Sequence, residues 1–256
     1  MKFLRFLLCL LLLQGCALQG YLAGQVDVFM EMRLQSHLDL YYQQKKKLSL
    51  DIDIWLNKQK TYLPEARSFL LAVNPAKPQE IPAAIHAFNL LYQRSAHEFN
   101  QLFSGYLSQL DEQQRKHFFH KQHQDNQALK EQIGKMDLEK LKERVEFFSG
   151  SLTLEQTPLL KDFLPDWIKR SKQRLERRIN LHKKLKDILS SNVLNQEELV
   201  NLAFRNYVDS SFENLAPVVS FLQRFSATLT PEQISHLERR RTKLLELLES
   251  FNKAQF

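Results

Sequence analysis

The sequence predicts an all-α fold, an irregular multi-helix body of about eight helices. Glycine is scarce, with six residues in 256, and apolar residues recur at spacings of three and four over long stretches. Alternating strand-like runs are almost absent. Helix-start signals also recur. Two segments fit the capping box, Thr153-Leu154-Glu155-Gln156 and Thr230-Pro231-Glu232-Gln233. In this motif the threonine hydroxyl and the glutamine side-chain oxygen accept hydrogen bonds from backbone N–H groups at the start of the helix.

Periodicity and punctuation place the helices in order. Asn74-Pro75-Ala76-Lys77-Pro78 is the clearest break, because two prolines in so short a stretch cannot continue a helix. Residues 1–15 read as a signal peptide, and residues 16–256 read as one helical domain that would divide, if at all, near 74–78. The predicted helices are 20–38, 50–73, 80–107, 111–133, 137–149, 153–190, 196–227 and 230–252.

Individual residues support these boundaries. Asp111 with Gln114, and Asn195 with Glu198, repeat the capping logic. Prolines inside helical patterns should kink or split their helices, and this concerns Pro64, Pro165 and Pro217. The triplet Asp209-Ser210-Ser211 is a further place where the helix 196–227 can divide. Large aromatic residues at helical spacing are expected in the core, namely Trp55, Phe69, Phe88, Phe99, Phe103, Phe118, Phe147, Phe163, Trp167, Phe204, Phe221 and Phe225.

The N-terminus carries the features of an export signal. Lys2 and Arg5 precede an apolar run from Phe6 to Leu13, which is too short to span a membrane. Leu13-Gln14-Gly15-Cys16 resembles a bacterial lipobox, although Gln14 replaces the small residue that the pattern prefers. The resemblance implies cleavage before Cys16, acylation of Cys16 by diacylglycerol and an amide-linked chain such as palmitate, and attachment to the outer membrane facing the periplasm.

Composition limits the partners and the chemistry. The formal charge is +7, and removal of Lys2 and Arg5 leaves 34 − 29 = +5. Cys9 lies in the predicted signal and Cys16 would be blocked by lipid, which excludes a thiol nucleophile and thiolate zinc ligands in the mature chain. A basic exported protein is expected to meet lipid headgroups, cell-wall polymers or acidic envelope proteins rather than nucleic acid.

Several motifs together resemble an uncharacterised family of proteobacterial lipoproteins that is defined only as a domain of unknown function. They are the lipobox, Leu48-Ser49-Leu50-Asp51 leading to Trp55, Leu63-Pro64 followed by Arg67 to Leu71, and Leu152-Thr153-Leu154-Glu155-Gln156 ahead of Trp167. The resemblance covers most of the mature chain. It implies a location and a helical fold, and it implies no known activity.

A second resemblance rests on two short motifs. Leu152-Thr153-x-x-Gln156 and Leu229-Thr230-x-x-Gln233 lie 229 − 152 = 77 residues apart and are similar to the paired motifs of Spy-like periplasmic chaperones. Those proteins are helical and basic and use no cofactor, so this resemblance implies binding of unfolded client proteins. The same motif is also simply a good helix cap.

The densest charge feature lies between Lys169 and Lys186. It contains nine basic residues against Glu176 alone, a balance of +9 − 1 = +8 in 18 residues, and an apolar stripe runs beside the charges. An amphipathic basic helix of this kind either binds an anionic surface or forms the solvated face of a bundle. The candidate binding residues are Lys169, Arg170, Arg174, Arg177, Arg178 and Lys184.

Catalytic and metal motifs are weak. His117, His120 and His123 are the best metal candidates, but residues at i, i+3 and i+6 drift by about 60° per step, so the three cannot easily share one ion. The sequence contains no H-E-x-x-H motif, no G-x-S-x-G elbow and no glycine-rich phosphate loop. No catalytic residue and no cofactor are therefore predicted.

These observations favour a lipid-anchored envelope protein that binds another macromolecule as a scaffold or adaptor, without catalysis. Two alternatives stay open, a Spy-like chaperone that binds unfolded clients and a hydrolase acting on cell wall or lipid. The predicted partners are the membrane, through the lipid anchor, and an envelope protein or an anionic lipid or polymer.

Overall fold

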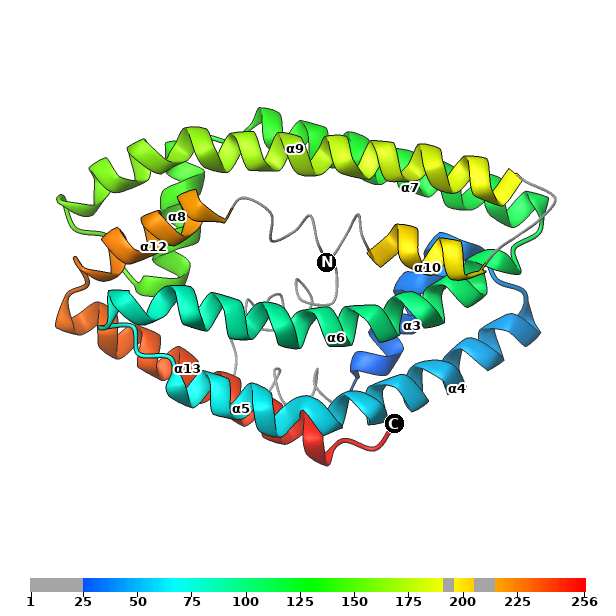
Figure 1. Cartoon of the computed structure of the whole chain (residues 1–256), viewed down its shortest axis with the longest axis horizontal. Helices are drawn as coiled ribbons and strands as arrows, with labels where there is room; N and C mark the ends of the chain where they lie inside the picture. Colours follow the sequence, from blue (N-terminus) through cyan, green and yellow to red (C-terminus); the bar gives the residue numbers. More distant parts are fainter. Residues whose placement is uncertain (1–24, 191–195, 205–214) are drawn as a thin grey trace.

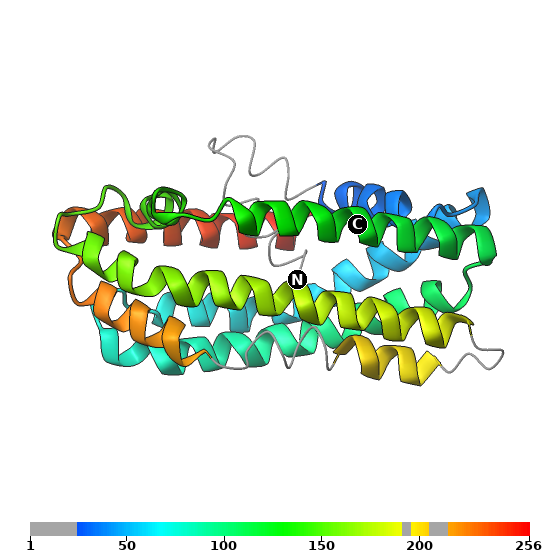
Figure 2. The same ribbon diagram turned by 90° about the horizontal axis from the view of Figure 1, so that it is seen from above.

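The computed structural model describes residues 25–190, 196–204 and 215–256. Within these ranges the chain forms α-helices, two short 3₁₀ helices and turns, and no strand is present. The predicted all-α class is therefore confirmed. The helices run mostly along the long axis of an elongated body, as Figure 1 and the perpendicular view in Figure 2 show.

The helices divide into two groups along the chain. The first group comprises α3 (Val26–Leu38), α4 (Tyr42–Gln59), the 3₁₀ helix η1 (Lys60–Tyr62), α5 (Leu63–Ala72), the 3₁₀ helix η2 (Pro78–Glu80), α6 (Ile81–Ser108) and α7 (Glu112–Gly134). The second group comprises α8 (Leu138–Ser149), α9 (Gln156–Ser190), α10 (Gln196–Phe204), α12 (Ala216–Ser226) and α13 (Pro231–Lys253).

Most predicted boundaries lie within a few residues of the observed ones, with one clear exception. The helix predicted at 50–73 begins instead at Tyr42, because the Gln44 side chain accepts a hydrogen bond from the Tyr41 amide at 2.9 Å and caps α4. The lysine run 45–47 then occupies the first turns of this helix. The predicted range 50–73 left this run outside the helix, although exposed lysines are good helix formers.

The three helix-interior prolines behave differently from one another. The chain tightens into η1 just before Pro64, which occupies the first turn of α5, so the predicted split is found there. Pro165 lies inside α9, which continues through it without splitting. Pro217 occupies the first turn of α12. Asn195 and the triplet 209–211 lie outside the described residues.

The two groups of helices repeat one another in order and length. Short α3 and α8 contain 13 and 12 residues, and the closing helices α7 and α13 contain 23 each. The long arm 42–72 corresponds to α9, and in chain order α6 corresponds to α10 and α12. In each group the short helix packs on both the long arm and the closing helix. The fold is thus an internal duplication of one helical unit.

The sequence carries a matching repeat. Leu40, Gln44, Leu48 and Trp55 have counterparts at Leu152, Gln156, Leu160 and Trp167, all offset by 112 residues. Leu110, Gln114 and His117 likewise match Leu229, Gln233 and His236, offset by 119. Both sets begin at a corner where one helix ends and the next begins.

In the second unit, two of these corners are joined by a buried glutamine pair. The Gln156 amide donates to Gln233 Oε1 at 2.8 Å, and the Gln233 amide donates back to Gln156 Oε1 at 2.9 Å. Each amide also donates to the other corner, to the carbonyl oxygens of Thr228 and Ser151. The Thr153 and Thr230 amides donate to the same two side-chain oxygens. We call this arrangement the glutamine clamp.

The first unit contains a second clamp at the corresponding corners, in which one glutamine donates to the other. Gln114 donates to Gln44 Oε1 at 2.7 Å and to the Asp39 carbonyl oxygen at 3.0 Å. The Asp111 amide donates to Gln114 Oε1. Each clamp joins the beginning of the long arm of its unit to the beginning of the closing helix, and in Figure 1 the two clamps lie at opposite ends of the body.

Two apolar clusters fill the body. The larger contains residues of both units, including Leu48, Leu56 and Leu189, while the smaller groups Leu141 and Leu160 with two phenylalanines of α12. Of the predicted aromatic core, Trp55, Phe118, Phe221 and Phe225 are buried, and Phe99, Phe103, Phe163 and Trp167 pack partly buried against these clusters. Phe69, Phe88 and Phe147 are half-buried, so they are more exposed than expected. The side chain of Phe204 lies outside the described part.

Candidate functional site

The six predicted basic residues of α9 do not share one exposed face. Lys169 and Lys184 are exposed, whereas Arg170, Arg174 and Arg177 are half-buried. Burial, and after it the neighbouring Arg177 cation, lower the pKa of Arg170. The Arg178 side chain is only 12% exposed and points towards Asp125 of α7. The arginines are therefore part of the helix packing, and the lysines form the outer charge.

Five lysines between residues 169 and 186 of α9 face solvent, and within the described residues none of their ammonium groups lies within 4 Å of a carboxylate. They are Lys169, Lys172, Lys183, Lys184 and Lys186. Glu176 and Asp187 are the exposed acidic residues of the stretch 169–187, which leaves a surplus of positive charge on the surface of this part of the helix. Exposed ammonium groups that no neighbour neutralises are free to meet an external anion.

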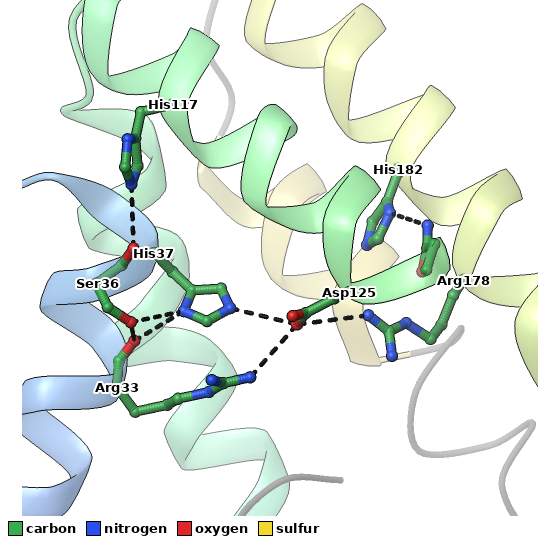
Figure 3. Close-up of polar contacts among 8 residues, drawn as sticks. Arg33, Ser36, His37, His117, Asp125, Arg178 and His182 are labelled. Carbon is green, nitrogen blue, oxygen red and sulfur yellow. Dashed lines mark hydrogen bonds and ion pairs between the residues drawn. The ribbon is translucent and has the colours of Figure 1, made fainter. Parts of the chain in front are cut away.

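A polar cluster around Asp125 connects three helices (Figure 3). The Asp125 carboxylate Oδ2 lies 3.3 Å from His37 Nε2 and 3.4 Å from the Arg33 guanidinium, both on α3. Arg178 approaches the same oxygen from α9 at 3.8 Å. Beside it, the Asn126 amide donates to His182 Nδ1 at 3.0 Å. One carboxylate thus faces three basic side chains and links the short helix of the first unit to the basic helix of the second.

The imidazole ring of His37 faces two hydrogen-bond acceptors. Its Nδ1 lies 2.9 Å from the Arg33 carbonyl oxygen, which can only accept a hydrogen bond, while Nε2 faces the carboxylate. A neutral imidazole has one N–H and satisfies one of these acceptors. The ring is buried, and both of its nitrogens lie in the contact that docks α3 on α7.

Ser36, His37 and Asp125 superficially resemble a nucleophile, base and carboxylate. Ser36 Oγ lies 3.1 Å from His37 Nδ1, but the hydroxyl donates to the Arg33 carbonyl oxygen at 2.9 Å. A ring nitrogen that donates to the same carbonyl oxygen cannot also accept the serine proton. Ser36 lies within a regular helix, where the backbone amides that would stabilise an oxyanion are already bonded. This geometry supports helix docking and does not support acyl transfer.

The predicted metal candidates are held by separate partners. His117 Nε2 lies 3.0 Å from the Ser36 carbonyl oxygen, His120 pairs with Gln124 at 2.9 Å, and His123 pairs with Gln127 at 3.5 Å. Among the residues that the structure describes, no group of three or more histidine, cysteine or acidic side chains is placed to hold a metal ion.

The predicted lipid-attachment residue, Cys16, lies outside the described residues. In the part that is described, no helix is both long enough and apolar enough to cross a membrane.

Sequence reasoning missed the Asp125 cluster and the glutamine clamps. Asp125 and His37 are 88 residues apart, and no local pattern marks either one. The clamp of the first unit was missed because tyrosine and aspartate occupy the threonine positions, at Tyr41 and Asp111. The shared Leu-x-x-x-Gln spacing, with Trp55 and Trp167 each 11 residues after the glutamine, would have revealed the duplication.

Comparison with known proteins adds no relative to this picture. No family model matches the chain, and no significant match is found among curated proteins or solved structures.

Proposed function

We propose that this protein is a lipid-anchored component of the cell envelope that binds another macromolecule without catalysis. In this proposal Cys16 carries the lipid, the body faces the periplasm from the outer membrane, and the lysines of α9 contact an anionic partner. The lipobox resemblance supports the anchor. The exposed and unneutralised lysines of α9 support the binding surface, and they are the observation that carries the proposal.

The partner that this surface fits is an acidic envelope protein or polymer. Screening limits each exposed charge to a reach of about 8–10 Å near physiological ionic strength, so the partner must lie directly against α9. Because the five lysines spread along one long helix, they match an extended anion better than a compact one. Binding of this kind weakens as salt is added.

The experiment compares two triple variants of the lipidated protein purified from membranes. Lys172, Lys183 and Lys186 are changed to glutamate in the test variant, and the exposed Lys77, Lys243 and Lys253 are changed to glutamate in the matched control. Affinity capture from solubilised envelopes is expected to recover one defined partner with the parent and the control, and to lose it with the test variant. Equal recovery by all three proteins contradicts the proposal.

A chaperone role is the second candidate, and the duplicated glutamine clamp favours it. Paired Leu-Thr-x-x-Gln motifs are the feature that resembles Spy-like chaperones, and here they occur as one strict pair and one altered pair. A chaperone should suppress aggregation of several unrelated unfolded proteins at near-stoichiometric ratio. A scaffold should leave their aggregation unchanged and capture one partner, so the two assays together separate the candidates.

A further inference from the structure

The outer face of the α3–α4 helix pair exposes four aliphatic side chains. Val28 and Met32 on α3 are 43% and 58% exposed, and Leu50 and Ile54 on α4 are each 59% exposed. Residues 28 and 32, like 50 and 54, are one helical turn apart. These four residues are called the apolar face below.

The seam between the two helices shows that the four side chains point to one side. The Ser49 hydroxyl donates to Glu31 at 2.6 Å, and Asp53 lies within electrostatic range of Asp27 and Glu31. These pairings run in opposite directions, so the helices are antiparallel. On α3 the exposed Val28 and Met32 directly follow the seam residues Asp27 and Glu31. On α4 Leu50 and Ile54 directly follow Ser49 and Asp53 in the same way, and one position along a helix is a turn of about 100°. In antiparallel partners that turn carries both rows to the same side of the pair.

The second unit provides an internal comparison for this face. The short helices α3 and α8 end at Asp39 and Gly150, which both have a positive φ. Aligning the two helices at these end residues also matches buried Met30 with buried Leu141. Val28 and Met32 then correspond to Glu139 and Glu143. On the long helices, where Leu48 matches Leu160, the counterparts of Leu50 and Ile54 are Asp162 and Asp166.

The same face of the duplicated unit is therefore apolar in one copy and acidic in the other. The packing of the unit does not demand aliphatic residues at these positions, since four carboxylic acids occupy them in the second unit. Exposed aliphatic residues that the fold does not need indicate a surface that meets something outside the chain.

The position of the apolar face indicates its occupant. Val26, the first residue of α3, follows Cys16 by ten positions, and the nine residues between them span at most about 30 Å when extended. Tyr42, which is 76% exposed, and the exposed Lys46 continue the α4 row at four-residue steps. Tyrosine and lysine beside aliphatic residues are the composition of helices that lie in a membrane interface.

We propose that the apolar face docks on the surface of the bilayer that holds the lipid anchor, with Val28, Met32, Leu50 and Ile54 entering the interface and Lys46 meeting anionic headgroups. This inference rests on the proposed function for the nearness of the membrane. Docking would hold the first unit against the lipid, while the acidic face of the second unit is repelled by it. The body would then have a fixed orientation instead of swinging freely on its tether.

The first test places a label on the face in the lipidated protein. The mature chain offers no free thiol if Cys16 is acylated, so Leu50→Cys and, as control, the similarly exposed Leu71→Cys of α5 each give one labelling site. The labelled proteins are reconstituted in vesicles of phosphatidylethanolamine and phosphatidylglycerol that contain brominated lipid. Quenching at position 50 but not at position 71 is expected. Equal quenching at both positions, or none at position 50, overturns the proposal.

The second test removes the anchor by Cys16→Ala and measures flotation with the same vesicles. Met32→Glu with Leu50→Glu is compared with Leu71→Glu with Leu90→Glu, which removes as many exposed aliphatic residues from α5 and α6. The first pair is expected to weaken binding about 10- to 100-fold, and the second pair to leave it unchanged. Circular dichroism checks that both pairs stay folded. Equal binding by all three proteins overturns the proposal.

The two arms separate this inference from the function proposed above. If Cys16 proves unlipidated in cells while the anchor-free chain still binds vesicles through the apolar face, the anchor fails and the docking surface stands. If Cys16 is lipidated and position 50 stays unquenched, the docking surface fails and the anchored binding protein stands.

Discussion

Removing one glutamine of the clamp in the second unit should destabilise the protein strongly, although no charge and little apolar volume is lost. Gln156 is fully buried, and its side chain takes part in hydrogen bonds with Thr153, Thr228 and Gln233. In Gln156→Ala the Thr153 amide, the Thr228 carbonyl oxygen and the Gln233 side chain lose their partner together.

The expected cost follows from these groups. A buried polar group left without a partner costs about 1–3 kcal/mol, and a typical hydrogen bond contributes about 1 kcal/mol. Some of the exposed groups will recruit water, so Gln156→Ala should lower the free energy of unfolding by about 3–5 kcal/mol. Gln127→Ala is the matched control, since Gln127 is exposed on α7, and its cost should stay below about 0.5 kcal/mol.

Urea denaturation measures both values, with tryptophan fluorescence reporting on Trp167, which packs beside the smaller apolar cluster. The double variant Gln156→Ala, Gln233→Ala provides the decisive comparison. Because the two side chains bond to each other, the second substitution should cost less in the presence of the first, with a coupling energy of about 1–3 kcal/mol. Additive effects, or a loss below about 1 kcal/mol for Gln156→Ala, would refute the assignment of the clamp as the joint between the two corners.

Three further predictions address charged groups. Asp125→Ala should destabilise the fold by about 1–3 kcal/mol, more than the exposed Asp162→Ala in the same denaturation assay, because buried His37 and Arg178 lose their common anion. Burial, and after it the Arg240 cation, hold the pKa of His236 below its ordinary value. The stability that neutral His236 contributes is therefore present above about pH 6.5 and is lost as the pH falls through that value towards the folded pKa. In thermal melts from pH 7 to 5, His236→Gln should flatten this loss of stability, and an unchanged slope contradicts this prediction. Burial, Asp27 and Glu31 raise the pKa of Asp53, so vesicle binding of the anchor-free chain should strengthen as the pH falls towards the pKa of this carboxyl. Asp53→Asn should strengthen binding already at pH 7, and a variant that binds no more strongly than the parent contradicts the role given to this seam.

Much of the fold could be predicted from local patterns. The capping boxes at Asp111 and Thr230 are present as expected, with the side chains accepting from the Gln114 and Gln233 amides. These signals act within one helical turn, so the sequence displays them directly. Pro165 lies inside α9, as the predicted helix 153–190 implies, and of the two outcomes expected there, a kink or a split, the split does not occur.

The candidate surfaces were only partly predictable. The composition of α9 indicated a basic helix, but its period did not show that Arg178 turns inward to Asp125 while Lys172 and Lys183 remain outside. Burial of a long side chain depends on which helices lie against it. Likewise, Leu50 reads as an ordinary apolar position of an amphipathic helix, and its exposure appears only once α3 and α4 are packed together.

The sequence by itself therefore determined the helical class, most helix ends and the surplus of positive charge, because each depends on neighbours within a few positions of the chain. Tertiary structure decided which residues meet across long separations: Gln156 with Gln233, Asp125 with His37, and the two rows of the apolar face. A hydrogen bond between residues 77 positions apart forms only after the helices have assembled, since its strength lies in the burial that assembly creates.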